Sequence, residues 1–156
     1  MTVQLGPDPT GTELRYALIA AHGCDIAMLT VEAMLNDGHE AGEAARYLAS
    51  GAPLPMGARP VIVADATVHG AVRVEQLLRL WPTELPRPYL ITVADAPSGP
   101  PSAARYRIRA LGARLAGTAR VPYLPVLRTV TDPADAMTHQ DVSTAATKLR
   151  RHLEGL

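Results

Sequence analysis

The chain has 156 residues, 47% of them hydrophobic and 19% charged, and its 15 basic side chains balance 15 acidic ones. This length suits one domain that buries a core without help from disulfides or metals. The single cysteine, Cys24, excludes an internal disulfide and fits a reducing compartment. The balanced charge creates no global field for nucleic acid or membranes. With no signal-peptide pattern and no membrane-length apolar run, we expect a soluble cytoplasmic protein without membrane contact.

Strand-like and helix-like patterns alternate along the chain. Residues 1–13, rich in proline and glycine, predict an irregular arm before a single domain over 14–156. We expect strands at 14–21, 61–66, 91–96 and 118–127, and helices at 26–36, 40–49, 72–81, 104–115 and 142–153. This alternation predicts an α/β fold: a single Rossmann-like domain with a mostly parallel sheet of about four to five strands and helices on both faces.

Two of the expected strands are alike and end in a carboxylate. Residues 61–66 (VIVADA) and 91–96 (ITVADA) lie 30 residues apart, the size of one strand-helix-strand unit. Ligands of such folds bind beyond the carboxyl ends of the strands. The candidate ligand-binding residues are therefore His22, Gly23, Asp65, Thr67, Asp95 and Ser98.

The two aspartates allow more than one interpretation. A carboxylate at a strand end can hold Mg²⁺ directly or through water, and a nearby hydroxyl can assist. Alternatively, Asp65 and Asp95 cap the helices that follow or fix their own loops through bonds to the backbone.

The loop after the first strand lacks the residues of a phosphate-binding loop. Such a loop needs several glycines and a lysine, but residues 21–25 (AHGCD) hold one glycine. The only lysine of the chain, Lys148, falls in the last expected helix. Asp25 instead predicts a helix N-cap.

Histidines and the cysteine offer one further arrangement. His22, Cys24 and His69 could meet as metal ligands or as a nucleophile with its base. Their spacing matches no usual zinc or cysteine-histidine pattern, and a small cysteine is usually structural. We therefore expect no metal and no cofactor.

Possible partner surfaces are basic or apolar. Arg105, Arg107, Arg109 and Arg114 form a basic stripe on one helix, which suits a phosphate-rich or acidic partner, nucleic acid included, or merely a solvated face. Apolar side chains exceed what one helix face can hide, which favours a protein partner or homo-oligomer. They are Met28, Leu29, Met34, Leu77, Leu80 and Trp81. From these surfaces we select Arg105, Arg109 and Trp81 as partner-binding candidates.

Four segments carry a family resemblance. They are residues 18–23 (LIAAHG), 61–65 (VIVAD), 91–97 (ITVADAP) and 120–125 (RVPYLP). In this order they resemble the ParA/MinD-like branch of P-loop NTPases, and more closely a small bacterial family of degenerate relatives that lack the Walker A lysine. The resemblance spans about residues 14–128. It implies that 120–125 is the strand and loop that embraces the nucleotide base in relatives with intact sites.

Three functions follow as hypotheses. The resemblance implies a non-hydrolysing interaction or assembly module, of a mobile-element, partition or secretion system, and weak nucleotide binding at most. The strand-end residues favour instead a small enzyme or binding protein for a nucleotide or sugar phosphate. The arginine-rich helices favour a nucleic-acid-binding protein. Because the phosphate-binding lysine is missing, we expect a protein that is not an enzyme.

Overall fold

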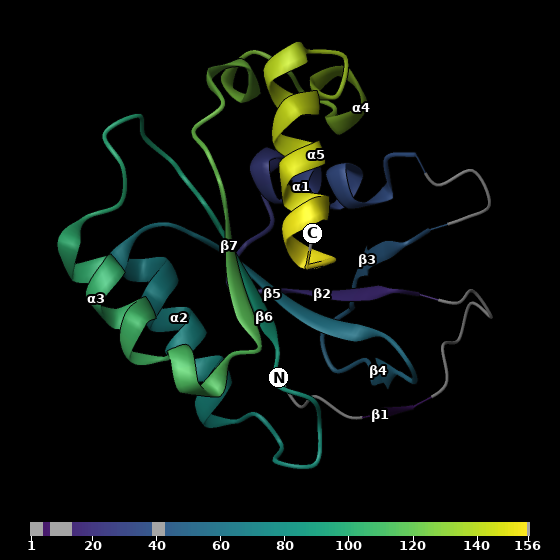
Figure 1. Ribbon diagram of the computed structural model, residues 1–156, viewed down its shortest axis with the longest axis vertical. Helices are drawn as coiled ribbons and strands as arrows, with labels where there is room; N and C mark the ends of the chain where they lie inside the picture. Colours follow the sequence, from purple (N-terminus) through teal and green to yellow (C-terminus); the bar gives the residue numbers. More distant parts are fainter. Residues whose placement is uncertain (1–4, 7–13, 39–42, 156) are drawn as a thin grey trace.

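The computed structural model describes residues 5–6, 14–38 and 43–155 (Figure 1). Of the predicted arm, only β1 (Leu5–Gly6) belongs to the described residues, and it pairs in parallel with β4 (Leu54–Pro55). The rest of residues 1–13 lies outside them.

Five strands form the main sheet, and all of them run parallel, which confirms the predicted α/β class. Their spatial order is β3-β2-β5-β6-β7. The strands are β2 (Tyr16–Ala20), β3 (Ala45–Tyr47), β5 (Arg59–Asp65), β6 (Tyr89–Val93) and β7 (Gly117–Val121). From β2 the chain first moves outward to β3 and then back across to β5. The carboxyl ends of β2 and β5 therefore form the switch point of a doubly wound sheet, where ligands of such folds bind.

Helices cover both faces of this sheet (Figure 1). On one face α1 packs against α4 and α5, and α5 also contacts β7. On the other face α2 packs against β5 and α3. The helices are α1 (Ile26–Asn36), α2 (Val68–Arg79), α3 (Ser102–Ala110), α4 (Pro133–Ala136) and α5 (Gln140–Leu153). Among the described residues, none of the helices combines the length and apolar character that a bilayer crossing requires.

Side chains of the central strands alternate between two cores. Leu18, Val61 and Ile91 belong to the core beneath α1 and α5, whereas Ile62 and Leu90 belong to the core beneath α2 and α3. Because both faces of a central parallel strand are buried, its sequence is apolar throughout instead of alternating. This explains the continuous apolar runs that located the strands.

The helix predicted over 40–49 is wrong. Residues 39–42 lie outside the described residues, and the following ones form β3, an edge strand parallel to β2. The side chain of Asn36, at the end of α1, fixes its start: Oδ1 accepts the N–H groups of Ala44 and Ala45 at 2.7 and 2.8 Å. The alanines and glutamates of this segment favour a helix locally, but pairing with β2 overrides that preference.

Other boundaries also differ from expectation, among them the start of α2, which lies at Val68 instead of residue 72. The strand predicted over 118–127 ends at Val121, because Pro122 and Pro125 cannot donate to a sheet. The helix predicted over 104–115 spans 102–110 and continues as a 3₁₀ turn over Gly112–Arg114. Gly117 opens β7, and a Cβ at this position would overlap the ring of Tyr89.

Candidate functional site

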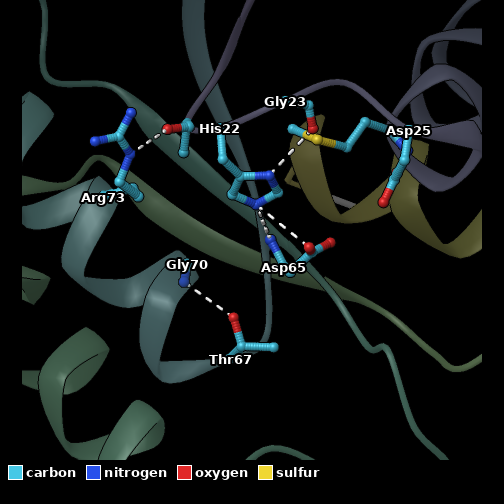
Figure 2. A network of polar contacts seen from close by, with 9 residues as sticks. His22, Gly23, Asp25, Asp65, Thr67, Gly70 and Arg73 are labelled. Carbon is cyan, nitrogen blue, oxygen red and sulfur yellow. Dashed lines mark hydrogen bonds and ion pairs between the residues drawn. The ribbon is translucent and has the colours of Figure 1, made fainter.

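His22 follows β2 and lies at the switch point between β2 and β5 (Figure 2). Its Nε2 atom accepts the backbone N–H of Asp65 at 2.9 Å, and its Nδ1 atom lies 3.2 Å from the carbonyl oxygen of Gly23. A ring nitrogen that accepts an N–H cannot also donate, so in this arrangement Nδ1 is the nitrogen that faces the carbonyl oxygen of Gly23 as a donor. His22 therefore joins the two strand ends as a structural link.

The β2–α1 turn does not have the form of a phosphate-binding loop. At its end Asp25 caps α1, with Oδ1 accepting the N–H of Met28 at 3.1 Å. A phosphate held by a helix N-terminus would use the same N–H groups and the same positive end of the helix dipole. The predicted N-cap is confirmed, and a carboxylate occupies the position suited to an anion.

Asp65, the last residue of β5, lies in an acidic setting. Its Oδ2 atom lies 3.5 Å from Nε2 of His22, and its side chain keeps 28% of its surface exposed. Burial raises the pKa of this carboxyl, the charges of Asp25 and Asp95 raise it further, and His22 and His69 oppose the shift.

Neither strand-end aspartate caps a helix, so the helix caps predicted at Asp65 and Asp95 are wrong. α2 is capped by Thr67, whose Oγ1 accepts the N–H of Gly70 at 2.9 Å, and Pro101 precedes α3 without a side-chain cap. α2 begins so close to β5 that a Cβ on Gly70 would overlap the carbonyl oxygen of Asp65. Thr67, directly before the first residue of α2, therefore supplies the cap in place of Asp65. Asp95 is exposed and makes no hydrogen bond or ion pair with another described residue, and Ser98 is also exposed.

The cysteine and histidines do not assemble into a reactive centre. The rings of His22 and His69 lie 6.0 Å apart between centroids. Cys24 is exposed, and desolvation together with the charges of Asp25 and Glu32 raises the pKa of its thiol, which disfavours the reactive thiolate. Within the described ranges, no three His, Cys, Asp or Glu side chains are grouped so as to hold a metal ion.

A cleft of about 370 Å³ lies between α3 and the sheet. Thr92 of β6 lines it together with Thr118 and Arg120 of β7. Thr92 and Arg120 are direct partners in the parallel register, so their side chains stand side by side on the same face of the sheet. We call this hollow the arginine cleft.

The structure brings predicted residues from two separate groups into this cleft. Arg105 and Arg109 of α3 line it, and so do Asp65 and Thr67 at the end of β5 and the start of α2. The sequence had placed the arginines in a partner surface and Asp65 and Thr67 in a ligand site. His22, Gly23, Asp95 and Ser98 do not line the cleft.

The apolar partner surface is smaller than predicted. Met28 and Met34 are fully buried beneath α1. Leu80, at the end of α2, remains 68% exposed. Trp81 is half-buried, and its Nε1 donates to the carbonyl oxygen of Pro86 at 3.0 Å.

Sequence reasoning missed Thr92 and Arg120. The available signal was a polar residue at the second position of ITV (91–93) and the middle of ARV (119–121), in strands that are otherwise apolar. Only the register of β6 against β7 shows that these two positions are neighbours.

Comparison of the chain with protein-family models, curated proteins and solved structures gives no significant match.

Proposed function

We propose that this protein is a non-hydrolysing binding module on a Rossmann-like scaffold, whose carboxyl edge recognises a ligand or partner without transferring a phosphoryl group. The observation that carries the proposal is the carboxylate of Asp25 at the N-terminus of α1. It repels a phosphate at the N-terminus of the helix that follows β2, where a P-loop would hold its phosphates.

Residue chemistry supports the same proposal. Phosphoryl transfer relies on a cationic side chain, a metal and backbone donors that act together on the transferred group. The only lysine, Lys148, belongs to α5 and not to the β2–α1 turn. Arg73, which reaches this turn, already donates from Nε to the carbonyl oxygen of Ala21 at 3.3 Å.

The resemblance to degenerate ParA/MinD-like relatives gives the proposal its biological context. On that basis the protein serves assembly in a mobile-element, partition or secretion system, and binding replaces turnover. Exposed Leu80 beside Trp81 supports a protein partner or a second copy at this end of α2. Sedimentation of the wild type and Leu80→Gln tests this part, with concentration-dependent association of the wild type alone as the expected result.

A turnover assay tests the proposal. Purified protein with Mg²⁺ and ATP or GTP should release no phosphate above the buffer rate. Asp25→Ser, which keeps a capping hydroxyl but removes the charge, should also remain inactive because the lysine is still missing. Mg²⁺-dependent turnover that a substitution within residues 22–25 abolishes would refute the proposal.

A further inference from the structure

The arginine cleft carries three cations without counter-ions. Arg105, Arg109 and Arg120 all line it, and none of their guanidinium groups makes a hydrogen bond or ion pair with another residue in the described part of the chain. By contrast, Arg107 on the same helix lies 3.3 Å from Oε2 of Glu75. Solvated arginines on a surface need no partner, but three that converge on one hollow create a local positive potential that favours an anion.

A buried hydroxyl gives independent evidence for a ligand. Thr92 is only 8% exposed, yet its hydroxyl has no hydrogen-bond partner among the residues that the structure describes. The other buried threonine in these ranges, Thr30, donates its hydroxyl to the carbonyl oxygen of Ile26 at 2.7 Å. Buried polar groups are nearly always satisfied, so an unpaired one that lines a cleft indicates a group that enters the cleft.

The arrangement of these groups restricts what can enter. Arg105 and Arg109 are four residues apart on α3 and share one side of that helix, while Arg120 approaches from the sheet beside Thr92. Guanidinium groups match the oxygens of a phosphate in two-pronged geometry, and a dianion can serve more than one of them. The cations and the hydroxyl donor thus suit a terminal phosphate.

The rest of the lining suits a small organic body. Ala104 and Ile108 of α3 and Pro100 before it form an apolar wall. The volume of about 370 Å³ lies within the range of small-molecule pockets. A nucleic-acid duplex could contact the exposed arginines, but its backbone is too bulky to reach the hydroxyl of Thr92 beneath them.

Asp65 at the rim modulates the site. Its carboxylate lies beside His22 and repels an anion in the neighbouring cleft. Burial raises the pKa of this carboxyl, which weakens the repulsion as the solution becomes more acidic.

We propose that the arginine cleft binds the phosphomonoester of a small organic molecule, with the phosphate held by Arg105, Arg109 and Arg120 and by the hydroxyl of Thr92. This inference rests on the proposed binding function and assigns it a site and a ligand chemistry. The site is separate from the β2–α1 turn, where a P-loop would hold its phosphates.

Calorimetric titration of the full chain tests the inference. The probes are inorganic phosphate, ribose 5-phosphate and adenosine monophosphate, each organic probe paired with its unphosphorylated form. We expect both monophosphates to bind at least ~10-fold more tightly than ribose or adenosine, because charge-assisted hydrogen bonds are lost without the phosphate. The stronger of the two monophosphates identifies the ligand as a nucleotide or a sugar phosphate.

Variants locate the binding. Arg109→Gln and Arg120→Gln should each weaken monophosphate binding about 10-fold, and Thr92→Val about 5-fold. Asp65→Asn should tighten it, since a repelling charge is removed. Arg87→Gln, an exposed arginine outside the cleft, is the matched control and should bind within about twofold of the wild type.

Three results would overturn the inference. They are no binding of either monophosphate, equal losses in Arg87→Gln and Arg120→Gln, and tighter binding of a DNA duplex that Thr92→Val leaves unchanged. Failure here is distinguishable from failure of the proposed function, because each of these results leaves the absence of ATP turnover intact. Conversely, ATP turnover would refute the proposed function whatever the monophosphates do.

Discussion

The two faces of the sheet are built differently. Beneath α1 and α5 lies a closed core that includes Met28, Met34 and Leu149, each almost fully buried. Beneath α3 the sheet remains partly open, and polar residues of β6 and β7 line the hollow. We call the side of the sheet beneath α1 and α5 the closed face and the side beneath α3 the open face. The closed face serves stability, whereas the polar residues of the open face are not required for stability.

The two buried threonines, one on each face, differ in the hydrogen bonding of their hydroxyl groups. Thr30 of α1 uses its hydroxyl within its own helix, whereas the hydroxyl of Thr92 has no partner in the described ranges. An unsatisfied buried hydroxyl costs folding free energy. Its presence on the open face is therefore better explained by binding than by packing.

The two faces should differ most in the free energy of unfolding that is lost when an apolar side chain is truncated. Met34→Ala beneath the closed face should lower the free energy of unfolding by about 2–5 kcal/mol, because it leaves a cavity. Ile108→Ala, which removes a half-buried wall of the cleft, should cost about 1 kcal/mol. Urea unfolding of both variants checks this, and equal losses would mean that the open face is packed as tightly as the closed one.

The side chain of Asn36 links the end of α1 to the start of β3. Asn36→Ala removes an acceptor from two backbone N–H groups and a donor, Nδ2, that lies 2.9 Å from the carbonyl oxygen of Ala45. We expect a loss of about 2 kcal/mol in urea unfolding. Gln76→Ala, on the exposed side of α2, is the control and should change stability by less than about 0.5 kcal/mol. A neutral Asn36→Ala would show that β3 does not depend on this link.

This region also shows what the sequence could reveal. The strands β2, β5 and β6 are largely apolar on both faces, with Thr92 as an exception in β6, so their composition alone identified them and the parallel sheet. β3 is short and lies at the edge, and its start depends on Asn36, nine residues before Ala45. Local patterns do not contain such a contact, which is why the segment was predicted as a helix.

The candidate site was predictable in part for the same reason. The rule for parallel sheets located Asp65 and Thr67 correctly at a strand end, and helical spacing located Arg105 and Arg109. That the four line one cleft depends on how α3 packs against α2. That Thr92 and Arg120 lie side by side follows only from the register between β6 and β7.

Replacing each buried threonine by valine tests the comparison directly in the absence of ligand. Thr92→Val should raise the free energy of unfolding by up to about 1 kcal/mol, because an unsatisfied hydroxyl gives way to a methyl group of similar size. Thr30→Val should lower it by about 1 kcal/mol, because a made hydrogen bond is lost. Thermal unfolding of the pair is the measurement. A destabilised Thr92→Val would indicate that its hydroxyl has a structural partner.

The smallest expected effect concerns pH at the rim of the open face. The pKa of Asp65 is raised in the folded state, so the folded protein loses stability as pH rises through that pKa, and below the unfolded pKa the loss is absent. Asp65→Asn should therefore be more stable than the wild type at pH 7 by about 0.5 kcal/mol, a modest value because solvent screens the partly exposed carboxylate. At acidic pH the two should converge.

Urea unfolding at both pH values measures this effect. Asp95→Asn, at the exposed carboxylate beyond the neighbouring strand, is the matched control and should change stability less. A wild type that is more stable than Asp65→Asn at pH 7 would mean that the ionised carboxylate has a stabilising partner.

Binding is expected at the open face of the sheet and not at the closed face. A nuclear magnetic resonance titration of ¹⁵N-labelled protein with adenosine monophosphate or ribose 5-phosphate follows both faces at once. We expect shifts at the amide of Thr92 and at the side-chain Nε groups of Arg105, Arg109 and Arg120, with no shifts along α1 and α5. Shifts confined to the β2–α1 turn and the first turn of α1, or none at all, would contradict it.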